Sequence, residues 1–218
     1  FGLVTHPGAG NWNGTLANAL LSYDSNLSKL DRAGIVHRLD KNTSGLMVVS
    51  KNTKSQKFLV EQLQSHSVER EYSAIVYGHM ISGGSINEPI GRDPKDRVKQ
   101  AILTNGKEAL THYRVIDRFK SHTHVKAILE TGRTHQIRVH LSHIEHPLIG
   151  DPMYGGRVRF PKKACQELKD ELINFQRQAL HSKKLTLTHP ASGKSMTWKA
   201  DIPDDMQGLL NTLKNFDS

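Results

Sequence analysis

The segment with the clearest chemical potential is His37-Arg38-Leu39-Asp40, which is followed closely by Thr43-Ser44-Gly45. It places a carboxylate in a polar, glycine-terminated loop directly before an apolar run, over which we predict a strand at residues 46–50. Loops that leave a rigid sheet are common positions for reactive groups. The alternative is a plain turn in which Asp40 accepts hydrogen bonds from amides of the same loop. This segment alone does not decide between the two interpretations.

A second segment, residues 130–140, carries a possible partner for that carboxylate. Alternating Ile137, Val139 and Leu141 predict a strand over residues 134–141 with these side chains facing the core, and Arg133 and His135 would share that face. A buried guanidinium is costly unless it is paired, so we expect Arg133 to pair with Asp40. Such a pair favours the charged form of the carboxylate, which can then act as a nucleophile.

The third segment is Arg70-Glu71-Tyr72, at the start of a strand predicted over residues 68–77. Tyr72 falls on the apolar side of that strand. Most tyrosines in such positions are core residues whose hydroxyl has a hydrogen-bond partner, and this interpretation remains open beside a catalytic one.

The remaining pattern predicts an α+β fold with a central mixed, largely antiparallel β-sheet and flanking helices. Helices are expected over residues 14–21, 54–64 with Thr53 as cap, 164–175 and 205–215. Further strands are expected over residues 125–130 and in a hairpin of residues 185–188 and 195–198. Asn105-Gly106 predicts a hairpin that joins residues 98–104 to 109–117. The chain has neither a P-loop nor a Gly-x-Gly-x-x-Gly motif, which argues against a nucleotide-binding parallel sheet.

Composition points to a polyanionic partner. The 218 residues include 30 Lys and Arg against 21 Asp and Glu, which gives a formal net charge of +9. Nucleic acid is the first expectation and an acidic membrane surface the second. The basic residues cluster at residues 92–99, 157–163 and 183–184. Apolar runs are far shorter than the ~20 residues of a membrane span, and the single cysteine, Cys165, excludes an intramolecular disulfide framework.

Three motifs in this order resemble the RluA family of pseudouridine synthases. They are the His37–Gly45 segment already described, Gly132-Arg133-Thr134-His135-Gln136-Ile137-Arg138-Val139-His140, and the run from His146 to Gly155. Residues 78–80 and 87–90 resemble the RluD-type branch, which modifies large-subunit ribosomal RNA. The resemblance covers nearly the whole chain and implies the pseudouridine synthase fold.

The resemblance also implies roles for individual residues. Asp40 matches the nucleophilic aspartate, and Tyr72 the tyrosine that stacks on the target base and is proposed as a general base. Arg133 matches the arginine that pairs with the aspartate. The residues implied to bind the RNA substrate or to line its pocket are Arg38, His37, Thr43, Ile137 and His135.

The implied activity is the isomerisation of uridine to pseudouridine in large-subunit (23S) ribosomal RNA, on a flipped-out base. It implies no cofactor, no metal and no membrane, and we expect a cytoplasmic monomer. Residues 1–218 are expected to be the catalytic domain, with an upstream S4-like RNA-binding domain and a first strand missing before Phe1. The same chemistry on another ribosomal RNA or a transfer RNA is the alternative, followed by a non-catalytic RNA-binding module.

A metal-dependent hydrolase is the remaining rival. His140, His143 and His146 lie close together in sequence and could join Asp151 around an ion. Their spacing does not bring all three onto one face of a helix, and Pro147 would interrupt that helix. Histidines that are polar surface or RNA-contact residues are the favoured interpretation.

Overall fold

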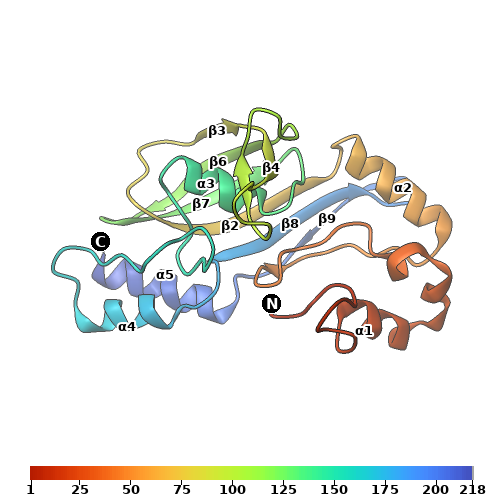
Figure 1. Ribbon diagram of the computed structural model, residues 1–218, viewed down its shortest axis with the longest axis horizontal. Coiled ribbons are helices and arrows are strands. Elements are labelled where there is room, and N and C mark those ends of the chain that lie inside the picture. Colours follow the sequence, from red (N-terminus) through yellow and green to blue (C-terminus); the bar gives the residue numbers. More distant parts are fainter. Residues whose placement is uncertain (218) are drawn as a thin grey trace.

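The computed structural model describes residues 1–217 and is built around one seven-stranded sheet (Figure 1). Its strand order is β1-β8-β2-β7-β6-β3, and β9 also pairs with β8. The strands are β1 (Ser44–Gly45), β2 (Glu69–Tyr77), β3 (Gly84–Asn87), β6 (Leu110–Arg118), β7 (His122–Leu129), β8 (Leu180–Thr188) and β9 (Ser195–Lys199). Only β1 and β8 are parallel, and the other pairs are antiparallel. The predicted mixed, largely antiparallel sheet is confirmed.

Strand β2 is buried on both faces, because helices cover the sheet from both sides. On one face, Ile137 and Leu141 of α3 pack with Tyr72, Ala74 and Val76. The opposite face is covered by helices α4 and α5, which pack on the side chains of alternate β2 residues. The helices are α1 (Leu16–Tyr23), α2 (Thr53–Gln64), α3 (Gln136–His143), α4 (Gln166–Asn174) and α5 (Asp204–Phe216), with 3-10 turns η1 (Ser25–Lys29) and η2 (Asp31–Gly34).

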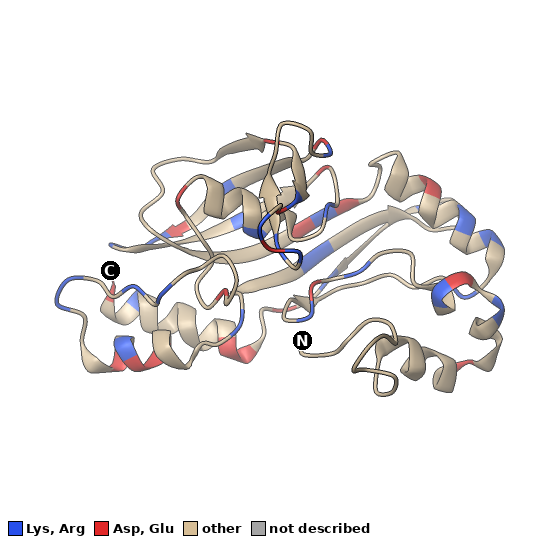
Figure 2. Ribbon diagram, in the orientation of Figure 1, with Lys and Arg blue, Asp and Glu red and all other residues tan. Residues whose placement is uncertain are grey.

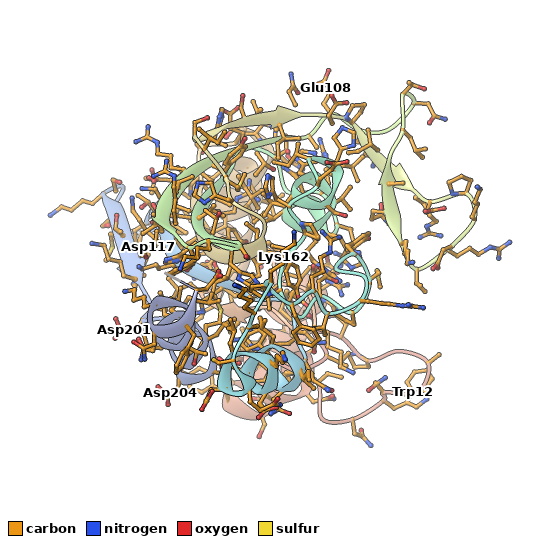
Figure 3. All side chains as sticks on the ribbon, turned by 90° about the vertical axis from the view of Figure 1, so that its left-hand side faces the viewer. Trp12, Glu108, Asp117, Lys162, Asp201 and Asp204 are labelled. Atoms are coloured by element: carbon orange, nitrogen blue, oxygen red, sulfur yellow. The ribbon has the colours of Figure 1, made fainter. Side chains whose placement is uncertain are left out.

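The N-terminal part forms a smaller core beside the sheet. Helix α1 and the two 3-10 turns pack around Leu27 and Ile35, and a backbone bridge joins Ile35 to Val49. Trp12 projects outward from the loop before α1, at the edge of the molecule (Figure 3). The segment that carries Asp40 therefore runs between this small core and the main sheet.

A separate two-stranded sheet, β4 (Ile90–Arg92) with β5 (Gln100–Ile102), lies beside α3. Ile90 packs with Val139 of α3, and the Gln100 amide donates a hydrogen bond of 2.8 Å to the Tyr154 hydroxyl. The predicted hairpin across Asn105-Gly106 is wrong, because β5 pairs with β4 and β6 joins the main sheet. The chain does turn there, but the turn brings Lys107 back to Ile90.

Two further strand predictions are wrong. Residues 134–141 are mostly the helix α3, because Ile137 and Leu141 are also spaced as one face of a helix, and alternation alone could not separate the two periods. Residues 46–50 lie outside the sheet ladder, with only a bridge from Val49 to Ile35, and the paired strand is the two-residue β1 just before them.

The other predicted elements are present, most of them within about two residues of their expected ends, but β8 begins at Leu180, five residues before the predicted start of that strand. Helix α2 begins at Thr53, but Asn52 is its cap, since the Asn52 side chain accepts a hydrogen bond from the Ser55 amide. Within residues 1–217, no helix has the length and apolar character needed to cross a membrane.

The packing of α4 on the sheet gives a direct test of the core. Leu172 is 1% exposed between α4 and α5, whereas its neighbour Ile173 is 47% exposed. We expect Leu172→Ala to lower the free energy of unfolding by about 2–5 kcal/mol, through lost burial and the cavity left behind. Ile173→Ala should lower it by no more than about 1 kcal/mol. Urea unfolding of both variants measures the difference, and equal losses would contradict the assigned packing.

Candidate active site

A cavity of about 590 Å³ opens between the Asp40 loop, the end of α2, strand β2 and the start of α3. It brings together every residue predicted for the site, although they come from three separate segments of the chain. These are His37, Arg38, Asp40, Thr43, Tyr72, Arg133, His135 and Ile137.

The Asp40 loop reaches this cavity because β1 pairs with the sheet immediately after it. Gly45 lies opposite Ser182 of β8, and Ser182 lies opposite Tyr72 of β2. The three residues thus align across neighbouring strands, which sets the loop beside the Tyr72 ring. Gly45 has a φ of +108°, and a Cβ there would collide with the Ser182 backbone, so only glycine allows this close pairing.

Other residues of the loop hold its shape. The His37 Nε2 accepts a 2.9 Å hydrogen bond from the Val48 amide, which ties the two ends of the loop together. Burial, with the nearby positive charge of Arg70, lowers the pKa of His37 to about 4, so its ring is neutral near neutral pH. Thr43 is buried and its hydroxyl accepts a hydrogen bond from Gln178.

The loop does contain the turn that was the alternative to a reactive site. The Thr43 amide donates to Asp40, but to its backbone carbonyl, at 2.8 Å. The Asp40 carboxylate is therefore not used by the turn. It lines the cavity with its side chain 21% exposed.

The partner of that carboxylate is Arg138 and not Arg133, which corrects the prediction. Arg138 Nη1 donates to Asp40 Oδ2 at 3.0 Å. The Nε and Nη2 atoms of the same guanidinium donate to the two oxygens of Asp151, at 2.7 and 2.9 Å. Arg133 instead donates through Nε to the carbonyl of Glu108, a residue at the upper edge of Figure 3.

The difference follows from the helix. Arg133 lies in the loop before α3 and stays partly exposed, whereas Arg138 lies in the first turn of α3 and is buried. Burial by itself lowers the pKa of Arg138, but the hydrogen bonds and charges of Asp151 and Asp40 raise it above its ordinary value. Burial by itself raises the pKa of Asp151, but Arg138 and two backbone amides bring it below its usual range. Both groups are therefore charged at neutral pH.

Tyr72 is buried at the base of the cavity with its ring in the main core. Burial raises the pKa of its phenol and Asp40 raises it further, whereas Arg70 and a hydrogen bond with Ser182 oppose the rise. The net shift is upward. The phenol is therefore protonated near neutral pH, and its phenolate is rare.

His135 stands on the other side of Asp40 and is linked to the β4–β5 sheet. Its Nδ1 is 2.8 Å from the Tyr154 hydroxyl, which also accepts a hydrogen bond from the Gln100 amide. Burial lowers the pKa of His135, with Asp40 acting against the shift. Its Nε2 lies 4.0 Å from Asp40 Oδ1.

Both the cavity lining and other parts of the chain carry positive charge. Arg38 is exposed and Arg133 partly exposed among the lining residues. Figure 2 shows Lys and Arg on the β4–β5 loop, on the loop before α4 and on β8, which matches the three basic clusters of the sequence. This arrangement suits a polyanion that lies across the molecule and inserts one group into the cavity.

The histidines weighed as metal ligands lie in other surroundings. The His140 ring contacts Thr111 and the Glu88 carbonyl, the His146 ring contacts the Tyr77 carbonyl, and Asp151 binds Arg138. Within residues 1–217, no group of three or more His, Cys, Asp and Glu side chains is placed to hold a metal ion.

Sequence comparison assigns the class of protein. The profile of the RNA pseudouridylate synthase family matches residues 2–143, which include the Asp40 loop, Tyr72 and all of α3. The chain belongs to this family.

Its relatives are similar over nearly its whole length. It is 52% identical over 213 residues to "Ribosomal large subunit pseudouridine synthase D" of Xanthomonas campestris, which covers 98% of the chain and 64% of that relative. The Pseudomonas aeruginosa protein of the same name is 54% identical, with 98% and 67% covered, and the Escherichia coli K12 protein is 53% identical, with 97% and 65% covered. The chain thus spans about two thirds of the length of these relatives.

Solved structures share the fold. The human RNA pseudouridylate synthase domain containing 4 superposes with a TM-score of 0.74 at 25% identity, covering 98% of this chain and 87% of that one. The human domain containing 1 protein gives a TM-score of 0.66 at 23% identity, covering 92% and 85%.

Because the Arg138 guanidinium serves two carboxylates, we expect Arg138 to contribute much more than Arg133 to the free energy of unfolding. Arg138→Met leaves two carboxylates without their partner, and we expect it to lower the free energy of unfolding by about 3–5 kcal/mol. Arg133→Met removes side-chain hydrogen bonding only to a backbone carbonyl and should lower it by about 1 kcal/mol or less. Urea denaturation of both variants tests this, and a larger loss for Arg133→Met would restore the pairing predicted from the sequence.

Because the His37 ring is neutral in the folded chain, we expect the free energy of unfolding to fall in acid. The unfolded chain takes up a proton on this residue below about pH 6.5, while the folded ring resists protonation until its pKa of about 4. The contribution of His37 to the free energy of unfolding is therefore fully present above pH 6.5. It falls by about 1.4 kcal/mol per pH unit as pH drops between these values. In His37→Gln, whose amide oxygen can still accept from Val48, the pH dependence of unfolding should be smaller by this amount. Equal slopes for the two proteins would show that His37 is not held neutral.

Proposed function

We propose that this chain isomerises uridine to pseudouridine in RNA, with Asp40 as the group that attacks the nucleotide. The observation that carries the proposal is the Asp40 carboxylate, which lines the cavity beside Tyr72 and is fixed by the 3.0 Å hydrogen bond from Arg138. A charge-assisted bond of this kind both orients a carboxylate and favours its ionised form.

The reaction begins with the target base leaving its stack. A uridine stacked in folded RNA cannot reach a carboxylate inside a cavity, so the nucleotide is flipped into the cavity at a cost of a few kcal/mol. Arg38, exposed at the opening, fills or braces the vacated space. The basic clusters bind phosphates and compensate for the cost, so RNA binding weakens as salt rises.

Inside the cavity, the uracil stacks on the Tyr72 ring and Ile137 closes the pocket from α3. Asp40 then attacks C1′, adds to C6 or removes the C2′ proton, which are three routes to a cleaved N1–C1′ bond. The freed ring turns and joins C1′ through C5. The C5 proton then leaves to the Tyr72 oxygen or to water, and the raised pKa of Tyr72 weighs against a phenolate.

The proposed substrate is large-subunit ribosomal RNA, because the relatives that match 97–98% of the chain carry that substrate in their names. We further propose that residues 1–218 make up a catalytic domain that acts in the cytoplasm as a monomer, with His37, Thr43, His135 and Arg133 shaping the site. Isomerisation needs no redox step and no external nucleophile, so no cofactor or metal is part of the proposal.

Removal of Asp40 tests the proposed function. We expect Asp40→Ala to bind large-subunit ribosomal RNA like the parent chain and to form pseudouridine more slowly by at least about 10³-fold. Asp31→Ala is the matched control, since Asp31 is exposed and lies outside the cavity. Carbodiimide-dependent primer extension on unmodified RNA measures the product and shows which uridines react. Full activity in Asp40→Ala would exclude Asp40 as the attacking group.

A further inference from the structure

Arg70 is a buried cation that lines the cavity without an acidic partner. Its residue is 7% exposed, and none of the ion pairs within residues 1–217 includes it. Its Nη2 donates to the Glu130 carbonyl at 3.0 Å, but its Nε has no hydrogen-bond partner. A buried, unsatisfied donor on a charged group costs stability, so its presence calls for an explanation.

The chain makes room for this guanidinium. A Cβ at position 132 would collide with Arg70 Nη1, so Gly132, at the start of the second motif, leaves the space that the guanidinium occupies. The Glu130 carbonyl and Gly132 together fix the end of the side chain. Arg70 is therefore held in place with its Nε unpaired, which leaves the guanidinium able to donate to a further acceptor.

The position of Arg70 relative to the other groups indicates which part of a nucleotide it meets. Arg70 and Tyr72 are two residues apart on one face of β2, which separates them by roughly 7 Å along the strand. Tyr72 aligns with Ser182 and with Gly45 at the end of the Asp40 loop, whereas Arg70 lies opposite Leu185, farther along the sheet. The Arg70 guanidinium reaches the Glu130 carbonyl and Gly132, on the side of Tyr72 away from that alignment.

We propose that Arg70 donates a hydrogen bond to a carbonyl oxygen of the flipped uracil and so selects uracil over cytosine. This inference rests on the proposed function, in which Asp40 meets the sugar and Tyr72 the base. The group beyond Tyr72 then meets the far edge of the ring. Uracil presents the acceptor O4 there, whereas cytosine presents an amino donor, and a guanidinium can only donate.

A phosphate is the other acceptor that a guanidinium could bind, and burial argues against it. The base enters a flipping pocket most deeply, while the phosphates stay near its opening. Arg38, which is exposed, and Arg133, which is partly exposed, line the same cavity and suit the backbone, whereas Arg70 is nearly closed off from solvent.

The test uses two RNAs that differ only in uridine or cytidine at a target position mapped with the parent chain. Each competes, unlabelled, against pseudouridine formation in labelled substrate. We expect the parent chain to favour the uridine RNA, and Arg70→Met to reduce that preference by about tenfold to a hundredfold, the loss of a hydrogen bond from a charged donor. Arg114→Met is the matched control, because Arg114 is exposed on β6 outside the cavity.

A second measurement separates recognition from a structural role. Because Arg70 is buried without an acid, Arg70→Met should keep or raise the melting temperature while the preference falls. Gly132→Ala, which displaces the guanidinium, should reduce the preference in the same direction.

Three outcomes would overturn the inference: an unchanged preference in Arg70→Met, equal binding of both RNAs by the parent chain, or a lower melting temperature with the preference retained. If the parent chain forms no pseudouridine at all, the proposed function itself fails, which is a distinguishable result.

Discussion

The site depends on one guanidinium shared between two carboxylates. Arg138 binds both oxygens of Asp151 and one oxygen of Asp40, so α3, the loop after it and the Asp40 loop meet at a single charge. Asp151 accepts further hydrogen bonds from the amides of Met153 and Tyr154, which fixes it firmly. Asp151 therefore holds the arginine, and the arginine holds Asp40. A buried charge can persist at this position because its hydrogen bonds leave it well compensated.

The sheet supplies the other half of the construction. Alignment of Gly45, Ser182 and Tyr72 across three strands sets the distance between the carboxylate loop and the aromatic ring. Two neutral histidines, His37 and His135, lie near Asp40 and add no further positive charge to the cavity. His37 closes the loop, His135 contacts Tyr154 beside the β4–β5 sheet, and burial lowers the pKa of each ring. The cavity lining thus combines the Asp40 carboxylate, these two neutral rings and several arginines.

Much of this was predictable from the sequence, and the failures have physical reasons. The long strand β2 could be predicted from the local pattern, whereas residue types left the roles of Asp40 and Tyr72 open, and only the resemblance to the family assigned them. The choice of Arg133 over Arg138 depended on assigning a strand to residues 134–141. Branched residues at alternate positions favour a strand, but tertiary packing on β2 selects the helix, and the arginine that faces Asp40 changes with it. The role of Asp151 was hidden for a related reason, since its partner becomes visible only when the helix brings Arg138 to it. Arg70 lies two residues before Tyr72, yet nothing in the local sequence indicates that a buried arginine lacks an acidic partner.

The most direct measurement of the central claim is tritium release from unmodified large-subunit ribosomal RNA labelled at C5 of its uridines. Formation of the new carbon–carbon bond expels the hydrogen at C5, whichever route Asp40 takes. The account predicts that the 218-residue chain releases tritium into water in an amount that matches the pseudouridine formed. Retention of the label in RNA that the chain binds would contradict it.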